Sequence, residues 1–310
     1  MKTAFLFSGQ GAQYNLMGHE FYNEFDEVRQ LFDEASSLLE VDLSEICFRE
    51  DKRLNETPYT QPAILTVSHA IEEVIRHTLN ITPDAVAGLS LGEYTALVSS
   101  GALDFKQAVP LVHKRGSLME QAVPDGEGSM AAILGLDSKT LEDICQDVSK
   151  ESYVAIANYN TPEQLVISGE TTGVERAMTK AEDKGAKRVI RLNVSGPFHT
   201  ELLAPAGRKF SQALDGVSFG DFDYPVYSNV DAKIYKDSEA IKPLLTKQIS
   251  SPVRFEQMIR QMISDGVTTF IEVGPGKTLR SFVKSIDRSV TVKNIEKVKQ
   301  LETISKAVRS

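Results

Sequence analysis

Apolar residues in this chain form two kinds of pattern, short and mainly apolar runs and longer runs spaced by three or four positions. The short runs at 3–7, 84–88 and 267–273 predict buried strands, because a strand covered on both faces has few polar positions. From Met17 to Leu39 apolar residues recur in steps of three and four, which predicts one long amphipathic helix. Strands alternating with helices indicate a mainly parallel sheet, with ligands expected at its carboxyl edge.

Two prolines mark further helices in the first half of the chain. Gln61-Pro62 is expected to open a helix, because proline is tolerated in a first turn. A second helix, capped by Asp104, should run to about Ala122 with Pro110 in its interior. A proline there removes one backbone hydrogen bond and should kink this helix.

The middle of the chain predicts a second, smaller unit. A polar, glycine-rich stretch at 124–129 separates it from the first part. The pattern that follows is strand 130–134, helix 138–149, strand 154–157, strand 164–168, helix 172–184 and strand 187–192. This β-α-β-β-α-β order is that of a ferredoxin-like unit. We therefore predict a large domain of residues 1–126 and 196–310 with an insert at 127–195, and beyond the insert a strand at 224–229 and a helix opening at Ser251.

Composition narrows the function classes. A formal net charge of −9 argues against nucleic acid and anionic membranes as partners, since both favour basic surfaces. Cys47 and Cys145 are far apart and lack any C-x-x-C arrangement, so neither a disulfide framework nor a zinc ribbon is expected. The first apolar run is too short for a signal peptide, and no later run reaches membrane-spanning length. These features favour a cytoplasmic location.

Two glycine-rich loops suggest nucleotide binding but fail on spacing. Gly9-Gln-Gly11 follows a predicted strand, yet a dinucleotide fingerprint needs glycine at position 14, which is Tyr14. Gly276-Lys-Thr resembles the end of a phosphate loop, whose first glycine would fall on Ile271. The five histidines contain no H-x-x-x-H pair, so no metal centre is expected either.

One stretch does suggest covalent chemistry. Ser90 lies in Gly88-Leu-Ser-Leu-Gly92, between a predicted strand and a helix that should stop at Gly101. Strand, serine and helix is the arrangement of a nucleophile elbow, although an inert serine in a tight turn fits the same pattern. His199 is the candidate base, because it follows a loop and comes after Ser90, the chain order of α/β-hydrolase-like folds.

Several segments together resemble the malonyl-CoA:acyl carrier protein transacylases and the acyltransferase domains of fatty acid and polyketide synthases. The matching segments occur in the family's order, and they are Gly9-Gln-Gly-Ala-Gln13, Tyr59-Thr-Gln-Pro-Ala63, Gly88-Leu-Ser-Leu-Gly-Glu-Tyr94, Arg115-Gly116, Asn158-Tyr-Asn160, Gly196-Pro-Phe-His199, Gln248 with Ser251-Pro-Val-Arg254, and Glu272-Val-Gly-Pro-Gly-Lys277. The resemblance implies an α/β-hydrolase-like large domain with a ferredoxin-like insert, which agrees with the pattern above.

The resemblance also implies a catalytic pair. Ser90 would be the nucleophile and His199 its general base, oriented by a main-chain carbonyl near Gln248 and not by a carboxylate. Backbone N–H groups of Gln10 and Leu91 would bind the oxyanion that forms when a thioester is attacked.

Five residues are expected to bind substrate. Arg115 would hold the free carboxylate of a malonyl group through two parallel hydrogen bonds. Phe198 resembles the residue of malonyl-selective members, where its bulk would exclude an α-methyl group. Gln61 and Asn160 lie in matching segments and, with Gln248, are the other substrate-binding candidates.

The implied reaction passes malonyl from coenzyme A to Ser90 and then to the phosphopantetheine thiol of acyl carrier protein, in a ping-pong route that supplies type II fatty acid synthesis. No cofactor is implied besides these substrates. A thioesterase or carboxylesterase with the same serine and histidine is one rival reading, and a non-catalytic interaction module is another. An acidic carrier protein needs a basic docking patch, for which the candidates are Lys184, Lys187, Arg188, Arg191, Lys277 and Arg280.

Overall fold

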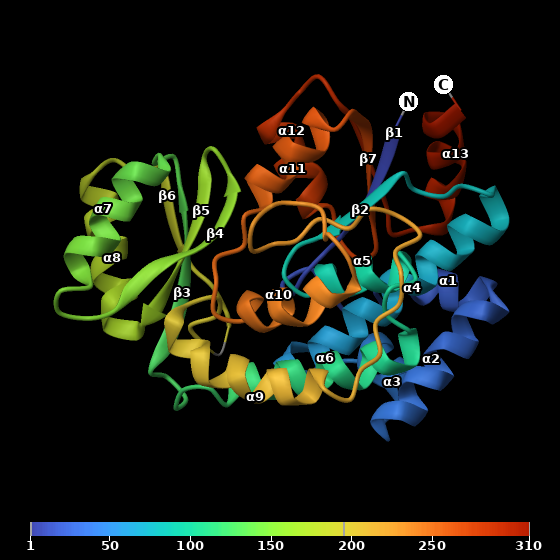
Figure 1. The fold of residues 1–310 in the computed structure, drawn as a ribbon, viewed down its shortest axis with the longest axis horizontal. Coiled ribbons are helices and arrows are strands. Elements are labelled where there is room, and N and C mark those ends of the chain that lie inside the picture. The colour runs from blue at the N-terminus through green and yellow to red at the C-terminus, as the bar shows by residue number, and fades with distance from the viewer. Residues whose placement is uncertain (1, 195, 310) are drawn as a thin grey trace.

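The computed structural model describes residues 2–194 and 196–309 and contains two separate sheets (Figure 1). The larger part is built on a parallel sheet in the order β2-β1-β7-β8, formed by β1 (Lys2–Phe7), β2 (Ala85–Gly88), β7 (Val267–Val273) and β8 (Thr291–Ile295). The three strands expected from the short, mainly apolar runs are therefore present, and β8 is an additional one.

Helices cover both faces of this parallel sheet. In chain order they are α1 (His19–Glu24), α2 (Asp26–Leu39), α3 (Leu43–Phe48), α4 (Thr57–Leu79), α5 (Gly92–Ser99), α6 (Phe105–Glu120), α9 (Ala204–Leu214), α10 (Ile241–Gln248), α11 (Phe255–Ser264), α12 (Thr278–Ile286) and α13 (Leu301–Arg309). Short 3₁₀ helices occur at η1 (Lys52–Asn55), η2 (Glu201–Leu203), η3 (Ser238–Ala240) and η4 (Val298–Gln300).

The central strand β1 contributes side chains to two hydrophobic cores. Phe5 and Phe7 pack into the core that contains α2, α4, α5 and α6, whereas Ala4 and Leu6 pack into the core that contains α11 and α12. Successive side chains of a strand point to opposite faces, so a strand between two helix layers buries apolar side chains on both faces. This is the physical reason why Ala4 to Phe7 are all apolar.

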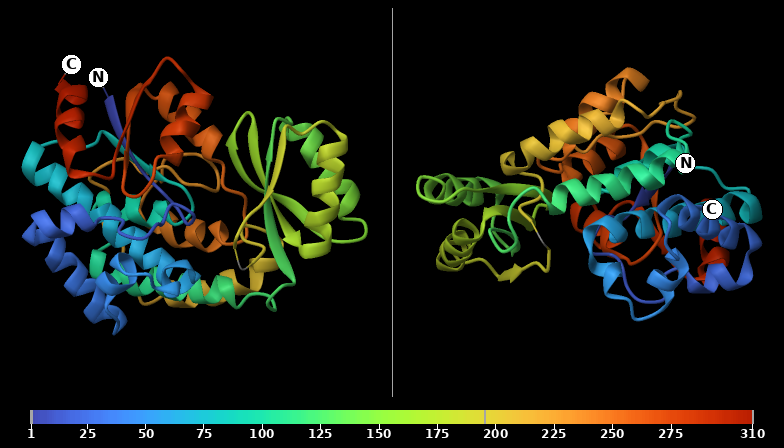
Figure 2. Two further views of the ribbon diagram at one scale, coloured as in Figure 1. Left: turned by 180° about the vertical axis from the view of Figure 1, so that it is seen from behind. Right: turned by 90° about the horizontal axis from the view of Figure 1, so that it is seen from below.

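The second sheet is antiparallel, in the order β4-β5-β3-β6. Its elements are β3 (Gly128–Leu134), α7 (Ser138–Val148), β4 (Val154–Thr161), β5 (Gln164–Glu170), α8 (Thr171–Asp183) and β6 (Arg188–Arg191). Figure 2 shows this sheet and its two helices extending to one side of the larger part. The predicted α/β class is confirmed, with a parallel α/β-hydrolase-like sheet and a separate β-α-β-β-α-β unit.

The two faces of the small sheet have different neighbours. Ala131 and Ile133 of β3 pack against α7 and α8, whereas Met130 and Ala132 belong to the core of the larger part. One face of the small sheet therefore contributes to the core of the larger part. The predicted ranges, 1–126 with 196–310 and 127–195, stay a prediction, and Met1, Ser195 and Ser310 lie outside the described residues.

Two predicted helices differ from the observed ones, the first by an interruption and the second by where it begins. The expected helix from Met17 to Leu39 is interrupted at Phe25, whose extended backbone separates α1 from α2. Both short helices bury apolar residues in the same core, so the apolar spacing continues across the break. The helix expected to open at Gln61-Pro62 begins earlier, because Pro58 occupies the first turn and Pro62 lies inside α4.

Two predictions beyond the insert were wrong in detail. Residues 224–229 form no strand, only single bridges from Val226 to Val86 and from Tyr227 to Ile234. Pro225 accepts from the Val86 amide but has no N–H of its own to extend a ladder. The helix expected at Ser251 begins at Phe255.

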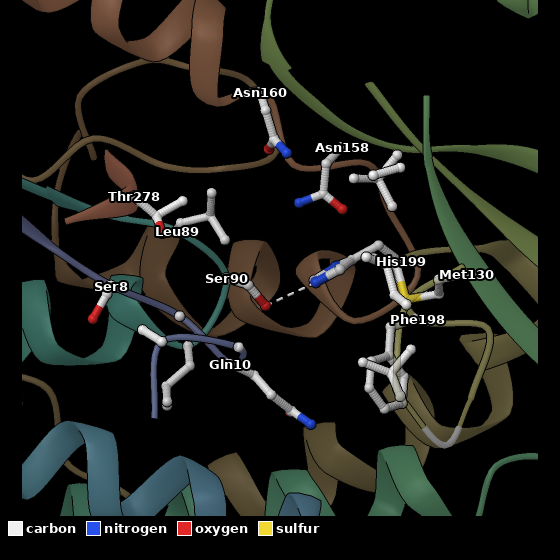
Figure 3. Close-up of a pocket in the computed structure, with 18 of the residues that line it drawn as sticks. Ser8, Gln10, Leu89, Ser90, Met130, Asn158, Asn160, Phe198, His199 and Thr278 are labelled. Atoms are coloured by element: carbon white, nitrogen blue, oxygen red, sulfur yellow. Dashed lines mark hydrogen bonds between the residues drawn. The ribbon is translucent and has the colours of Figure 1, made fainter. Parts of the chain in front are cut away.

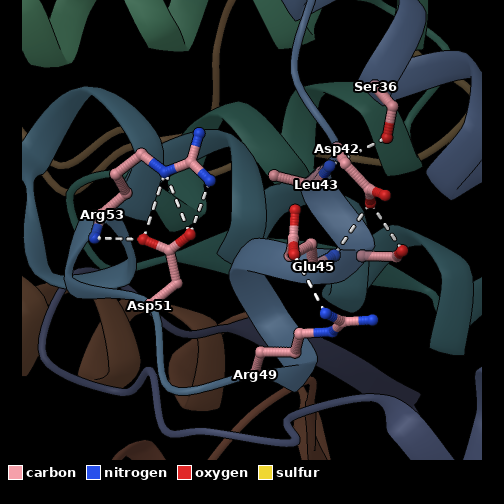
Figure 4. A network of polar contacts seen from close by, with 8 residues as sticks. Ser36, Asp42, Leu43, Glu45, Arg49, Asp51 and Arg53 are labelled. Carbon is pink, nitrogen blue, oxygen red and sulfur yellow. Dashed lines mark hydrogen bonds and ion pairs between the residues drawn. The ribbon is translucent and has the colours of Figure 1, made fainter.

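Side-chain caps stabilise the turns around α3, which lead into α4 (Figure 4). Asp42 caps α3 by accepting from the Glu45 amide at 2.8 Å, and the Ser36 hydroxyl accepts from the Leu43 amide at 3.0 Å. Each contact satisfies an amide that a helix start leaves unpaired. The path from α2 to α4 is thus held by local polar contacts.

Candidate active site

Ser90 lies in a sharp turn between β2 and α5. Its backbone φ is +53°, in the left-handed region that side-chain-bearing residues rarely adopt. A Cβ on Gly88 would lie 1.9 Å from the carbonyl carbon of Gly92, so only glycine fits there. The Ser90 amide donates to Asn229 Oδ1 at 2.6 Å, which holds the strained turn in place. This is the geometry of a nucleophile elbow.

The Ser90 hydroxyl contacts His199, which follows the strands of the small sheet in the sequence. Ser90 Oγ lies 2.7 Å from His199 Nε2 (Figure 3), and His199 Nδ1 lies 2.8 Å from the main-chain oxygen of Gln248. A carbonyl oxygen only accepts, so Nδ1 carries the ring proton and Nε2 is free to accept. The ring is therefore in the tautomer that can take a proton from Ser90.

The environment of His199 keeps its ring neutral. Burial, together with the positive charge of Arg115, lowers the pKa of His199 to about 4. At neutral pH the ring is unprotonated, which a general base requires.

Arg115 is almost completely buried beneath Ser90. Its Nη1 donates to Gln61 Oε1 at 2.8 Å, and its Nη2 donates to Gln248 Oε1 at 2.8 Å and to Ser90 Oγ at 3.1 Å. Arg115 lies on α6, which continues through Pro110, so the proline does not end the helix that presents this guanidinium. The site thus combines a hydroxyl, a neutral imidazole and a buried cation.

A cavity of about 440 Å³ opens above Ser90, between the loops that follow β1 and β2 and the inner face of the small sheet. Asn158 and Asn160 of β4 line it, as do Met130 and Phe198 on the other side (Figure 3). The Oδ1 atom of Asn160 is buried without a hydrogen-bond partner in the described residues, so a polar atom is available to a ligand.

The structure brings all nine candidate residues to one place. Those that line the cavity are Gln10, Gln61, Ser90, Leu91, Arg115, Asn160, Phe198 and His199. Gln248 lies behind the cavity and contacts both Arg115 and His199.

Three residues that contact the site were missed by the sequence analysis as candidates. Asn229 binds the Ser90 amide, and Glu93 and Tyr235 form a buried hydrogen-bonded pair behind Gln248. Glu93 had a signal, because it is an acidic residue within an otherwise apolar helix segment. Asn229 and Tyr235 had none, since both lie in an irregular stretch.

Other chemistries find little support in the described part of the chain. No cluster of three or more His, Cys, Asp or Glu residues there has the arrangement of a metal site. Cys47 and Cys145 are both buried and unbonded to each other. None of the described helices combines the length and the apolar character needed to cross a bilayer.

Known proteins resemble this chain over nearly its whole length. The sequence model of the family described as "Acyl transferase domain" matches residues 4–309. The malonyl CoA-acyl carrier protein transacylase of Bacillus subtilis is 49% identical over 311 residues, which cover 100% of this chain and 97% of that protein.

Solved structures agree with the sequence relatives. The crystal structure of malonyl CoA-acyl carrier protein transacylase from Clostridium perfringens has 43% sequence identity and a TM-score of 0.95, covering 100% of this chain and 98% of that one. A type II polyketide synthase acyl carrier protein in complex with its malonyl-transacylase has been solved as well, and a chain of that complex matches at a TM-score of 0.97 and 39% identity, covering 99% of this chain and 100% of that one.

Proposed function

The chain belongs to the acyl transferase domain family, and from that premise we propose that it transfers a malonyl group from coenzyme A to the phosphopantetheine thiol of an acyl carrier protein. The observation that carries the proposal is the Ser90–His199 contact directly above the buried Arg115. A general acyl hydrolase has no need of a buried cation next to its nucleophile, whereas a malonyl carrier does.

The reaction proceeds in two steps. Ser90 Oγ attacks the thioester carbonyl carbon while its proton passes to His199 Nε2, and the coenzyme A sulfur leaves with that proton. The carrier-protein thiol then gives its proton to His199 and attacks the acyl-serine, whose oxygen takes the proton back. The enzyme is unchanged, and the malonyl group has moved from one thiol to another.

Arg115 is the proposed partner of the malonyl carboxylate. Its guanidinium is already oriented by Gln61 and Gln248, and its Nε atom has no hydrogen-bond partner in the described residues. A carboxylate that binds a fixed guanidinium forms charge-assisted bonds, which are roughly twice as strong as neutral ones. This favours malonyl over neutral acyl groups.

The oxyanion is proposed to bind the backbone amides of Gln10 and Leu91. Both residues line the cavity next to Ser90, and Leu91 immediately precedes α5. A Cβ on Gly9 would lie 2.4 Å from the Leu89 carbonyl oxygen, so glycine there allows the two loops to approach each other. Two amides from different loops can then reach one oxygen.

The carrier protein is proposed to dock beside the small sheet. Lys187 and Arg188 line a second groove, and Gln164 and Phe282 line both this groove and the cavity above Ser90. A phosphopantetheine arm would thus pass from the basic groove to the serine. Lys187 pairs with Glu163 of the same groove at 3.6 Å, and Arg191 pairs with Glu175 of the same unit, which reduces the availability of both cations.

We further propose that the reaction uses no cofactor besides its two thioester substrates, that neither nucleic acid nor a membrane is a partner, and that the protein acts in the cytoplasm. The acidic net charge of −9 supports the proposal on nucleic acid and membranes, and a site whose chemistry is complete with side chains and backbone amides supports the proposal on cofactors. The two buried, unbonded cysteines support the cytoplasm.

The intact mass of the protein after brief exposure to malonyl-CoA tests this function, with Ser90→Ala as the matched variant. We expect one malonyl adduct on the wild type alone, discharged by holo-acyl carrier protein. Free malonate and coenzyme A without an adduct would instead indicate a thioesterase. An unreactive wild-type protein would indicate a non-catalytic module.

A further inference from the structure

A fully buried glutamate lies behind the catalytic pair. Glu93, in the first turn of α5, has no solvent exposure, yet both of its oxygens are hydrogen-bonded. Oε2 accepts from Gln248 Nε2 at 2.6 Å, whereas Oε1 accepts from the Tyr235 hydroxyl at 2.5 Å and from the Asn229 amide at 3.2 Å. Such a group is costly to bury, so its three donors require an explanation.

The contacts of Glu93 determine which way the Gln248 amide faces. Gln248 Nε2 donates to Glu93 at 2.6 Å and to the Ser90 carbonyl at 2.9 Å, which leaves Oε1 pointing at Arg115. An amide has one donating and one accepting end, and the two ends differ little in size. Burial raises the pKa of Glu93 to about 7, and the ionised carboxylate can only accept, so in that form it selects the orientation in which Gln248 Oε1 meets the guanidinium.

We propose that Glu93 is a positioning residue for malonyl selectivity, because it fixes the Gln248 amide and Gln248 in turn holds Arg115 toward the acyl group. Glu93 does not touch the substrate. This inference rests on the proposed role of Arg115 as the partner of the malonyl carboxylate.

Replacing Glu93 by glutamine tests whether the orientation of Gln248 depends on the Glu93 carboxylate. In Glu93→Gln the new side chain can still accept from Tyr235 and Asn229 through its oxygen, but its NH₂ group then faces the NH₂ group of Gln248. The conflict is relieved if Gln248 turns over, and its NH₂ group then lies against Arg115. Two donors facing each other cannot bond, so the guanidinium loses the acceptor that orients it.

The experiment measures kcat/KM for malonyl-CoA and for acetyl-CoA on the same sample, with transfer to holo-acyl carrier protein. Their ratio does not depend on the fraction of folded protein. We expect Glu93→Gln to lower the malonyl-to-acetyl ratio about ten-fold or more, mainly through a higher KM for malonyl-CoA, because a charged hydrogen-bond partner is misplaced.

Glu72→Gln is the matched control. Glu72 is equally buried and binds Arg76 and Ser99, but it does not line the cavity. It should lower the thermal midpoint and leave the ratio unchanged. A fall of the ratio in Glu72→Gln of the same size as in Glu93→Gln would overturn the inference, since any buried carboxylate would then have the effect.

Two further variants separate the possible failures. If Arg115→Ala leaves the ratio unchanged, the proposed function of Arg115 is wrong. If Arg115→Ala lowers it but Glu93→Gln does not, only the inference about Glu93 is wrong. Gln248→Met removes the side-chain amide and keeps Glu93. A wild-type malonyl-to-acetyl ratio in this variant would overturn the inference that Glu93 acts on Arg115 through Gln248, even if Glu93→Gln could not be purified. A low ratio would support it.

Discussion

Asn229 offers a direct test of how the serine turn is held. Its Oδ1 accepts from the Ser90 amide at 2.6 Å, and its Nδ2 donates to the Gly88 carbonyl at 2.7 Å. In Asn229→Ala both backbone groups lose their partner inside the protein. Each unpaired buried group costs about 1–3 kcal/mol, so we expect a loss of about 2–6 kcal/mol. For 310 residues this corresponds to a fall in Tm of about 3–9 °C.

The same variant should slow acylation, because the φ of +53° at Ser90 is no longer enforced. We expect the rate of coenzyme A release from malonyl-CoA to fall by about ten- to a hundred-fold, the cost of misplacing a reacting group. Calorimetry and rapid-mixing kinetics measure the two effects. An unchanged Tm and rate would refute the reasoning.

A buried asparagine away from the serine provides the control for Asn229→Ala. Asn294 on β8 accepts from Arg280 Nη1 at 3.1 Å and donates to the Gly276 carbonyl at 3.4 Å. Asn294→Ala should lower Tm less than Asn229→Ala does, because the Asn294 contact with the Gly276 carbonyl is long and only its contact with Arg280 is a short hydrogen bond. It should leave the acylation rate unchanged. Equal losses of rate in both variants would mean that the effect is not specific to the serine turn.

Four further predictions concern selectivity, the pH dependence of the rate and of the stability, and docking. Phe198→Ser should raise methylmalonyl turnover relative to malonyl about ten-fold or more by making room for one methyl group, and competition assays with both thioesters would detect it. Because burial and the Arg115 charge lower the pKa of His199 to about 4, protonation of His199 should reduce kcat/KM only as the pH drops toward 4 and not near 6.5. The lowered pKa of His199 also makes the free energy of unfolding depend on pH. Its stabilising contribution is complete above pH 6.5 and is lost as the pH falls through about 4, because the unfolded chain takes up the proton first. Tm measured against pH checks the sign. Joint charge reversal, Lys187→Glu with Arg188→Glu, should raise the KM for carrier protein several-fold at low salt and much less at high salt, whereas an unchanged KM would exclude the basic groove as the docking site.

The sequence by itself determined those features that depend on local spacing. The apolar runs predicted β1, β2 and β7 because a strand between two helix layers has no polar face. The order of strands and helices predicted the β-α-β-β-α-β unit. The Gly-x-Ser-x-Gly stretch predicted the elbow, since only glycine tolerates the close approach at Gly88.

The local sequence pattern was insufficient where a helix is interrupted and where irregular segments make the contacts. The interruption at Phe25 is invisible to apolar spacing, because the residues on both sides of it face one core. The strand predicted at 224–229 is reduced to single bridges at Val226 and Tyr227, next to Pro225, which has no N–H to extend a ladder.

Only the tertiary structure decided how the polar groups behind Ser90 are paired. Glu93, Asn229, Tyr235 and Gln248 are separated by up to 155 positions, yet they form one buried set of hydrogen bonds. No periodicity encodes such a set, because its members come from α5, from an irregular segment and from α10. Its partners exist only after the strands and helices pack, and burial from water is what makes those pairings obligatory.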